Sequence, residues 1–312
     1  MSQNKLTVID ALRMNTDNPD AVIAAGEVVN LRFKSGNQLS LRAAKLFCML
    51  VQHAGPAIAD DVQHVIHYSA VNDTFHQSKA DLIKAVDELH STIVSIRITS
   101  RKGRNYTKSG PILSDVERDD DDDTDAEIRF TFSPTLQRVI GDSTHWASMS
   151  RQAILAFESK YALRIYMFLS LRANLRKTSE VFQIDELRTI LGIHDNTLPR
   201  WQDLKRRALE PAQAEINHLA GFRMSFQPIK HGRRVTGVRL AWGLKAGDEL
   251  IDAARELERH RTGRTARREG KVEVIAQEHA AFRHSLASTI AAAPYDDATV
   301  AQSHEPNDRQ LQ

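Results

Sequence analysis

The sequence has little of several chemical features that define large classes of protein. It contains one cysteine, Cys48, which excludes a disulfide framework and any zinc or iron–sulfur site built from several cysteines. No apolar run reaches the roughly 18 residues of a transmembrane helix, and the first residues lack the apolar core of a signal peptide. We therefore expect a cytoplasmic protein, kept in a reducing compartment, that does not enter a membrane.

Motifs for catalysis and metal binding are also missing. No GxxxxGK[ST] phosphate loop is present, which argues against an ATP-driven helicase. His64 and His67 could share a metal ion on one face of a helix. Cys48 and His53 could complete that site, but no recognised zinc spacing accompanies them. A rolling-circle nickase needs two histidines separated by one apolar residue, whereas Val65 and Ile66 both separate these two.

A run of aspartates, Asp119 to Asp123, is the other candidate for a metal site. Carboxylates collect Mg²⁺ in two-metal enzymes, but only when rigid elements fix their geometry. A consecutive run in a loop splays its side chains and is typical of a solvated segment. We expect no cofactor, no metal ion and no enzymatic activity.

Positive and negative charges are nearly equal in number over the whole chain, but they are unevenly distributed along the sequence. The 312 residues, a length that suits two domains, include 42 lysines and arginines and 40 aspartates and glutamates. Residues 151–245 carry 17 basic and 8 acidic side chains, a net charge of +9. Residues 1–150 and 246–312 have net charges of −4 and −3. A basic middle indicates a module that binds a polyanion, although a solvated, arginine-rich surface gives the same pattern.

The first half of the chain has the element order of one small domain with helices and strands. Apolar residues recur every three or four positions in the expected helices and every second position in the expected strands. We expect a flexible arm over residues 1–25, a strand over 28–33, helices over 41–53 and from Ser78, strands over 91–100 and 127–132, and a helix over 133–140. The last two strands would pair as a hairpin, with the aspartate run in its long loop.

The second half repeats that order. We expect helices over residues 159–173, 184–191 and 200–219, then a hairpin over 222–242 with Gly232 in its turn. Gly192 is a favoured helix C-terminal cap. Three helices followed by a β-hairpin is the order of a winged-helix domain. The sequence therefore predicts an α+β protein with two tandem winged-helix domains, over residues 26–150 and 151–245. A C-terminal extension over 246–312 would be helical over 247–260 and over 272–286, and disordered over 290–312.

The third helix of the second domain carries the strongest sign of function. Its apolar positions recur at helical spacing and would face the core: Trp201, Leu204, Ala208, Ala212, Ile216 and Leu219. The opposite face presents Gln202, Arg206 and Gln213, and glutamine and arginine can read base edges in the major groove of DNA. Pro211 would either kink this helix or end it and start another.

The hairpin that follows concentrates positive charge at its turn, in the sequence KHGRR. Such a wing can lie along a neighbouring groove or the phosphate backbone, and phosphate contacts hold register without reading sequence. Helix and wing together favour DNA binding over a merely basic surface. The predicted DNA-binding residues are Arg200, Gln202, Lys205, Arg206, Arg207, Lys230, His231, Arg233 and Arg234.

Four stretches resemble the second half of bacterial plasmid replication initiators, the iteron-binding Rep proteins with tandem winged-helix domains. They are SKYALRIYMFLSLR, IDELRTILGI, WQDLKRRALEPAQAEIN and FQPIKHGRRVTGVRLAW. The resemblance covers residues 30–245 in the order of elements and is specific mainly over 159–242. Its most distinctive part is Leu-Glu-Pro-Ala followed by Glu215-Ile216-Asn217. The extension after Gly247 lies outside it.

The resemblance implies binding to repeated origin sequences in double-stranded DNA, local duplex opening and recruitment of a host initiator, helicase or primase. It also implies repression of the protein's own gene and a homodimer in equilibrium with a monomer. The first domain would serve dimerisation and secondary DNA contacts, and the second the main contacts. The aspartate run departs from this pattern, because carboxylates repel phosphates. A winged-helix transcriptional repressor without a replication role is the main alternative, and a nickase or primase is a further one.

Overall fold

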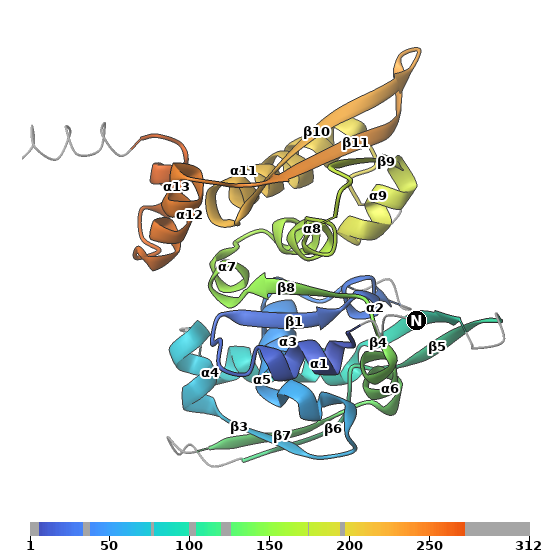
Figure 1. Cartoon of the computed structure of the whole chain (residues 1–312), viewed down its shortest axis with the longest axis vertical. Helices are drawn as coiled ribbons and strands as arrows, with labels where there is room; N and C mark the ends of the chain where they lie inside the picture. The colour runs from blue at the N-terminus through green and yellow to red at the C-terminus, as the bar shows by residue number, and fades with distance from the viewer. Residues whose placement is uncertain are drawn as a thin grey trace, which may run out of the picture. The chain divides into compact units, whose positions relative to one another are not determined.

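A computed structural model describes residues 6–33, 38–75, 78–99, 104–119, 126–173, 175–193 and 197–271 (Figure 1). The chain forms two compact units, residues 1–260 and 261–312. The first unit contains two tandem winged-helix domains, which confirms the predicted α+β fold class. No helix in the described ranges is both long and apolar enough to cross a membrane.

The N-terminal residues are part of the first domain. They form α1 (Val8–Met14), β1 (Ala21–Ala25) and α2 (Gly26–Val29). The backbone amide of Thr7 donates to the Asp10 carboxylate at 3.0 Å, and the Asp10 amide donates to the Thr7 hydroxyl at 3.1 Å. Strand β1 pairs antiparallel with β8 (Trp146–Ser150) and is almost wholly buried. The prediction of a flexible arm over residues 1–25 is therefore wrong for residues 8–25, because their apolar side chains enter the core; residues 1–5 lie outside the described residues.

Three of the remaining helices of the first domain begin at serines. The elements are α3 (Leu41–Ala54), the 3₁₀ turn η1 (Gly55–Ala59), α4 (Tyr68–Phe75), α5 (Lys79–Ser91) and α6 (Pro134–Asp142). The hydroxyls of Ser40, Ser78 and Ser133 accept hydrogen bonds from free amides of the first turns of α3, α5 and α6. The predicted helices over 41–53, from Ser78 and over 133–140 are confirmed, and α4 was not predicted.

The predicted pairing of the strands in the first domain is wrong. Strand β4 (Ile93–Thr99) lies between β2 (Arg32–Phe33) and β5 (Asn105–Pro111), so its hairpin partner is β5 and not the strand over 127–132. Strand β5 has no alternating apolar pattern, because it is an edge strand with mostly exposed side chains. The predicted strand over 28–33 is also shorter, since its first part forms α2.

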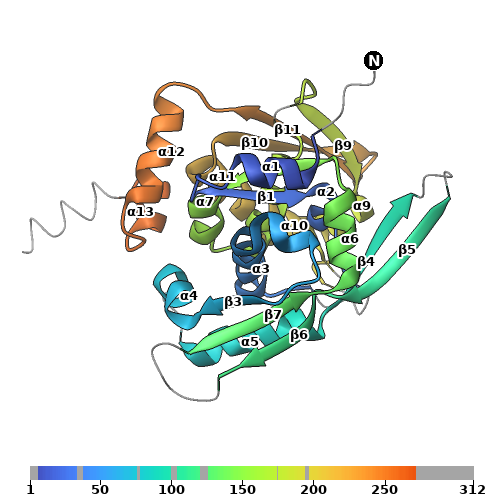
Figure 2. The same ribbon diagram turned by 60° about the horizontal axis from the view of Figure 1, so that its bottom comes forward.

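The strand over 127–132 belongs to a different sheet. It is β7 (Glu127–Phe132), which lies between β3 (His64–His67) and β6 (Leu113–Arg118). The β4–β5 and β6–β7 hairpins point in opposite directions in the first domain (Figure 2). Asp119 follows β6, while Asp120 to Asp123 lie outside the described residues. In the sequence, the acidic run therefore falls between β6 and β7 and not between β4 and β5.

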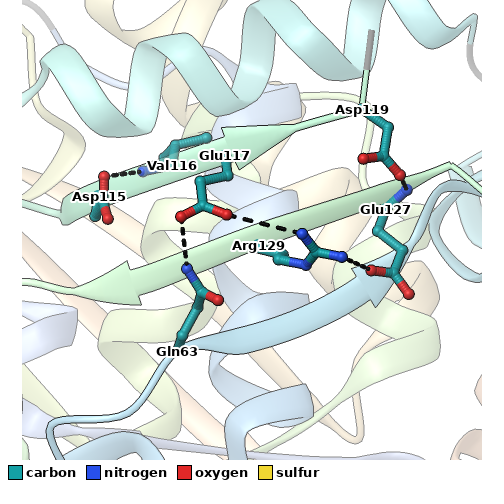
Figure 3. Close-up of polar contacts among 7 residues, drawn as sticks. All are labelled: Gln63, Asp115, Val116, Glu117, Asp119, Glu127 and Arg129. Carbon is teal, nitrogen blue, oxygen red and sulfur yellow. Dashed lines mark hydrogen bonds and ion pairs between the residues drawn. The ribbon is translucent and has the colours of Figure 1, made fainter. Parts of the chain in front are cut away.

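The outer face of the β3–β7–β6 sheet is polar and internally paired (Figure 3). The guanidinium of Arg129 lies 2.8 Å from the Glu127 carboxylate and 3.8 Å from that of Glu117. The Gln63 amide donates to Glu117 at 3.1 Å, and the Glu127 backbone amide donates to Asp119 at 2.9 Å. The ion pairs of Arg129 therefore neutralise part of the acidic charge on this face of the sheet.

The second domain contains the predicted helices and hairpin, and two further elements. It consists of α7 (Arg151–Ala156), α8 (Lys160–Ser170), β9 (Ser179–Gln183), α9 (Ile184–Leu191), α10 (Trp201–Leu204), the π-helical turn η2 (Lys205–Leu209), α11 (Glu210–Leu219), β10 (Phe222–His231) and β11 (Arg234–Leu244). Gly192 ends α9 in the left-handed conformation, as predicted. Helix α7 and strand β9 were not predicted. Strand β9 pairs with β11 to complete a three-stranded sheet.

The core of the second domain continues into the first. Its buried cluster around α8, α11 and the β10–β11 hairpin includes Val22, Ala24, Cys48 and Met49 from β1 and α3. The two domains therefore pack against each other through shared apolar contacts and are not joined by a flexible linker alone.

The C-terminal extension begins as predicted. Helix α12 (Asp248–Glu258) confirms the helix expected over 247–260. In the second unit, α13 (Arg264–Arg268) forms within the basic segment that follows. The helix predicted over 272–286 and the disorder predicted over 290–312 lie outside the described residues.

Candidate nucleic-acid interface

The third helix of the second domain is continuous, but its hydrogen bonding changes in the middle. The backbone N–H of Lys205 donates to the carbonyl of Trp201, four residues earlier, whereas that of Glu210 donates to Lys205, five residues earlier. Pro211 follows directly and has no N–H. In a regular α-helix its ring would clash with the carbonyl of Arg207. The helix therefore accommodates the proline with a π turn and neither ends nor restarts.

The two faces of this helix differ as predicted. Its core stripe is buried at Leu204, Ala208, Ala212, Ile216 and Leu219, and Trp201 is half-buried. The predicted DNA-binding residues at the helix start and in the π turn are all exposed: Arg200, Gln202, Lys205, Arg206 and Arg207. Gln213, by contrast, is half-buried. The exposed residues make one polar surface of the helix.

Two cations of this surface have intramolecular partners. The Lys205 ammonium lies 3.3 Å from the Glu210 carboxylate, and the Arg206 guanidinium lies 3.6 Å from Asp203. Because the lysine and arginine side chains are 47% and 70% exposed, each pair contributes only about 0–1 kcal/mol. Both cations can exchange these partners for phosphate oxygens at little cost.

The wing presents the other four predicted residues. Strands β10 and β11 pair down to His231 and Arg234, with a register shift beside Lys230. Gly232 in the turn has a φ of +62°, a conformation that side chains with a Cβ rarely adopt. Lys230, His231, Arg233 and Arg234 are all exposed. The turn and the strand ends beside it therefore expose four basic side chains at the end of the hairpin.

A hollow of about 600 Å³ lies between the wing and the start of the third helix. It is lined by residues of β9, α9, the turn before α10, α10 itself, the β10–β11 turn and β11. Four predicted residues line it together: Arg200 and Gln202 from the helix and Arg233 and Arg234 from the wing. The other five do not line it. The helix start and the wing therefore form one continuous concave, basic surface.

A buried arginine supports the turn before the helix. The guanidinium of Arg188, on α9, donates to the carbonyl oxygens of Thr197 at 2.6 Å and Leu198 at 2.9 Å. Leu198 has a φ of +53°, the only non-glycine residue with positive φ in the described ranges. This strained turn sets where the third helix begins. The sequence gives one signal for it, a basic residue between the apolar positions Leu187 and Leu191 of α9.

A second support joins the helix to the hairpin. The Asn217 side-chain amide donates to the Met224 carbonyl at 3.0 Å, and the Met224 amide donates to the Asn217 carbonyl oxygen at 2.7 Å. The Lys245 ammonium donates to the backbone carbonyl of Asn217 at 2.6 Å, and burial lowers the pKa of this lysine. These contacts explain part of the distinctive Glu215-Ile216-Asn217 motif, whose role sequence reasoning did not find.

A second basic hairpin was missed because the strand pairing was wrong. The β4–β5 wing includes exposed Arg104 and Tyr106 and half-buried Lys108. Arg101 and Lys102 lie outside the described residues. This wing, unlike the β6–β7 hairpin, is suited to a phosphate backbone.

Two of the weaker metal candidates, His64 and Cys48, are buried, whereas His53 and His67 are exposed. His64 packs against the rings of Phe130 and Phe132, with centroid distances of 5.3 and 5.8 Å. Cys48 is buried, and burial raises the pKa of its thiol to about 12. Among the described residues, no three histidine, cysteine, aspartate or glutamate side chains are grouped so that they could hold a metal ion.

Comparison with known proteins identifies the two domains. The model described as "Initiator Replication protein, WH1" matches residues 22–170, and that described as "Initiator Rep protein, WH2" matches residues 183–242. The first match extends through α8, past the predicted boundary at residue 150. No curated protein sequence matches the chain.

A solved structure is similar in fold, the crystal structure of Pi initiator protein in complex with iteron DNA. The TM-score is 0.53 at 15% sequence identity, covering 73% of this chain and 98% of that chain. At this identity the likeness shows the shared fold. Together with the two family matches, which follow one another in the order WH1 then WH2, it confirms the resemblance: the chain belongs to the initiator Rep proteins with tandem winged-helix domains.

Proposed function

We propose that this protein initiates plasmid replication by binding repeated origin sequences in double-stranded DNA. The observation that carries the proposal is the basic hollow where Arg200 and Gln202 of the third helix meet Arg233 and Arg234 of the wing. An α-helix fits the major groove, and an adjacent basic wing fits the backbone beside it. The solved Pi initiator structure, which shares the fold, contains iteron DNA.

The proposed DNA contacts are of two chemical kinds, contacts to base edges and contacts to phosphates. Gln202 and Arg206 carry side chains that can pair with base edges, so we assign them to sequence reading. Arg200, Lys205, Arg207, Lys230, His231, Arg233 and Arg234 are assigned to phosphate contacts, which hold register. The β4–β5 wing supplies secondary contacts from the first domain, a role that the acidic β6–β7 hairpin does not oppose because it lies on another sheet.

Family membership supports the remaining steps of the proposal. Bound copies open the neighbouring duplex and recruit a host initiator, helicase or primase, and binding beside the promoter represses the protein's own gene. The first domain also serves assembly, through a homodimer in equilibrium with a monomer. The protein acts in the bacterial cytoplasm, without a cofactor, as a binding protein and not an enzyme.

A footprinting experiment tests the proposal. The purified full chain is footprinted across the DNA that flanks its own gene. Protection of direct repeats beside an AT-rich stretch supports an initiator. Protection of a single inverted repeat supports the alternative, a winged-helix repressor without a replication role. Metal-dependent cleavage or primer synthesis by the purified chain would establish an enzyme instead.

A further inference from the structure

The π turn η2 alters which side chains the third helix exposes. Lys205, Arg206 and Arg207 are consecutive and all exposed. Leu204 before them and Ala208 and Leu209 after them are all buried. Successive residues of a regular α-helix are about 100° apart, so three of them span about 200° of its circumference. The wider π turn places the three cations together on the outer side of the helix.

The two ends of the helix are fixed independently. The turn at Leu198, held by Arg188, sets the start of α10, and the paired hydrogen bonds of Asn217 with Met224 fix α11 to the hairpin. The π turn between them accommodates one residue more than an α turn. Removing the π turn while both ends stay fixed would therefore rotate the outer residues by up to one position, or about 100°.

We propose that Pro211 is a positioning residue for DNA recognition, because it maintains the π turn that presents Lys205, Arg206 and Arg207 on one surface. Pro211 has no N–H to donate to the Arg207 carbonyl, and its ring excludes that carbonyl from the regular position. An alanine at this position restores the donor and removes the clash. The inference rests on the proposed DNA binding and adds to it the cause of the side-chain arrangement.

The test compares the full-length wild type with the Pro211→Ala variant. Binding is measured on a duplex that contains the footprinted repeat and on a scrambled duplex, each across a salt series. We expect Pro211→Ala to lose at least about tenfold in preference for the repeat, the effect of one misplaced base contact. On the scrambled duplex, the slope of log K against log salt should become shallower by roughly 0.9, because one cation turns away from the phosphates.

Thermal unfolding separates this effect from damage to the fold. A proline inside a helix is unfavourable, so Pro211→Ala should unfold at the same temperature as the wild type or higher. Pro134→Ala is the matched control, because Pro134 is an exposed proline in the first turn of α6, in the other domain. It should change neither repeat preference nor salt slope.

Each outcome decides a different point. If the wild type binds both duplexes but Pro211→Ala keeps its preference and slope, the inference about Pro211 is wrong and the proposed function stands. If the wild type binds DNA but does not prefer the repeat, the proposed function is wrong, and the slope on scrambled DNA still tests the role of Pro211. If the wild type binds no duplex, both fail.

Discussion

Lys45 of the first domain and Glu215 of the second both hydrogen-bond to the same short segment of chain, residues 155–159. The buried Lys45 ammonium donates to the carbonyl oxygens of Leu155 and Phe157, both at 2.6 Å, at the end of α7. The buried Glu215 carboxylate accepts from the backbone amides of Glu158 at 2.9 Å and Ser159 at 3.2 Å, just before α8. A cation thus meets the carbonyl end of one helix and an anion the amide end of the next, the arrangement that helix dipoles favour.

We expect Glu215→Gln and Lys45→Met each to lower the free energy of unfolding by about 1–3 kcal/mol, because buried backbone groups lose their charged partners. Since both residues hold one segment, the double variant should deviate from additivity by about 0.5–3 kcal/mol. Urea unfolding of the two single variants and of the double variant measures these changes in free energy. The exposed Lys84 provides the control, and Lys84→Met should shift stability by less than about 0.5 kcal/mol. Strict additivity would show that the two residues stabilise their own domains separately.

We expect alanine substitutions at Arg206 and at Arg233 to weaken DNA binding in different ways. Arg206→Ala should lose about 1–3 kcal/mol on the repeat duplex with little change on a scrambled one, since it removes a base contact. Arg233→Ala should weaken both duplexes alike and make the salt slope shallower by roughly one unit. Titrations across a salt series measure both, with substitution of the exposed Arg138 on α6, Arg138→Ala, as the control. Equal losses on both duplexes for Arg206→Ala would mean that it contacts only phosphate.

The β4–β5 wing should contribute phosphate contacts although its domain is net acidic. The double variant Arg104→Ala/Lys108→Ala should weaken binding to repeat and scrambled duplexes to the same extent, with a salt slope shallower by about one to two units. The same titrations measure it, and Lys84→Ala is the control on a helix of the same domain. An unchanged slope would restrict the first domain to assembly.

His64 should make stability depend on pH. Its Nε2 is buried without a hydrogen-bond partner, and burial lowers its pKa, with nearby His53 adding to the effect and Asp60 opposing it. The neutral ring is the form that fits the core. The contribution of His64 to folding stability is therefore complete when the pH is above the unfolded-state pKa of about 6.5. It is lost as the pH falls below that value, because the unfolded chain takes up a proton before the folded chain does.

Urea unfolding at pH 7, 6 and 5 measures this effect. The difference in unfolding free energy between the wild type and His64→Leu should shift in favour of the variant as the pH falls. The exposed His90 serves as the control, and His90→Gln should follow the wild type. A difference that is constant over this range would contradict the assignment.

The sequence was most informative where the pattern is local. The third helix and its hairpin have long amphipathic stretches and a glycine turn, so their limits and their exposed cations could be predicted. The partner of β4 could not, because the β5 sequence NYTKSGP belongs to an exposed edge strand and lacks the alternation that marks a half-buried one. Arg188 and Asn217 were missed for another reason: their partners, Thr197 and Met224, are set by the tertiary fold.

The pairing of β1 with β8 has a consequence for how the protein is made. The 120 residues between Ala25 and Trp146 must be synthesised before this ladder can close, which takes about 6–24 s at the usual rate of translation. Until then, the backbone hydrogen-bonding groups along one edge of β1 lack their partner strand. The third helix of the second domain is translated later still. A chain that terminates before Trp201 therefore lacks the helix to which we assign base reading.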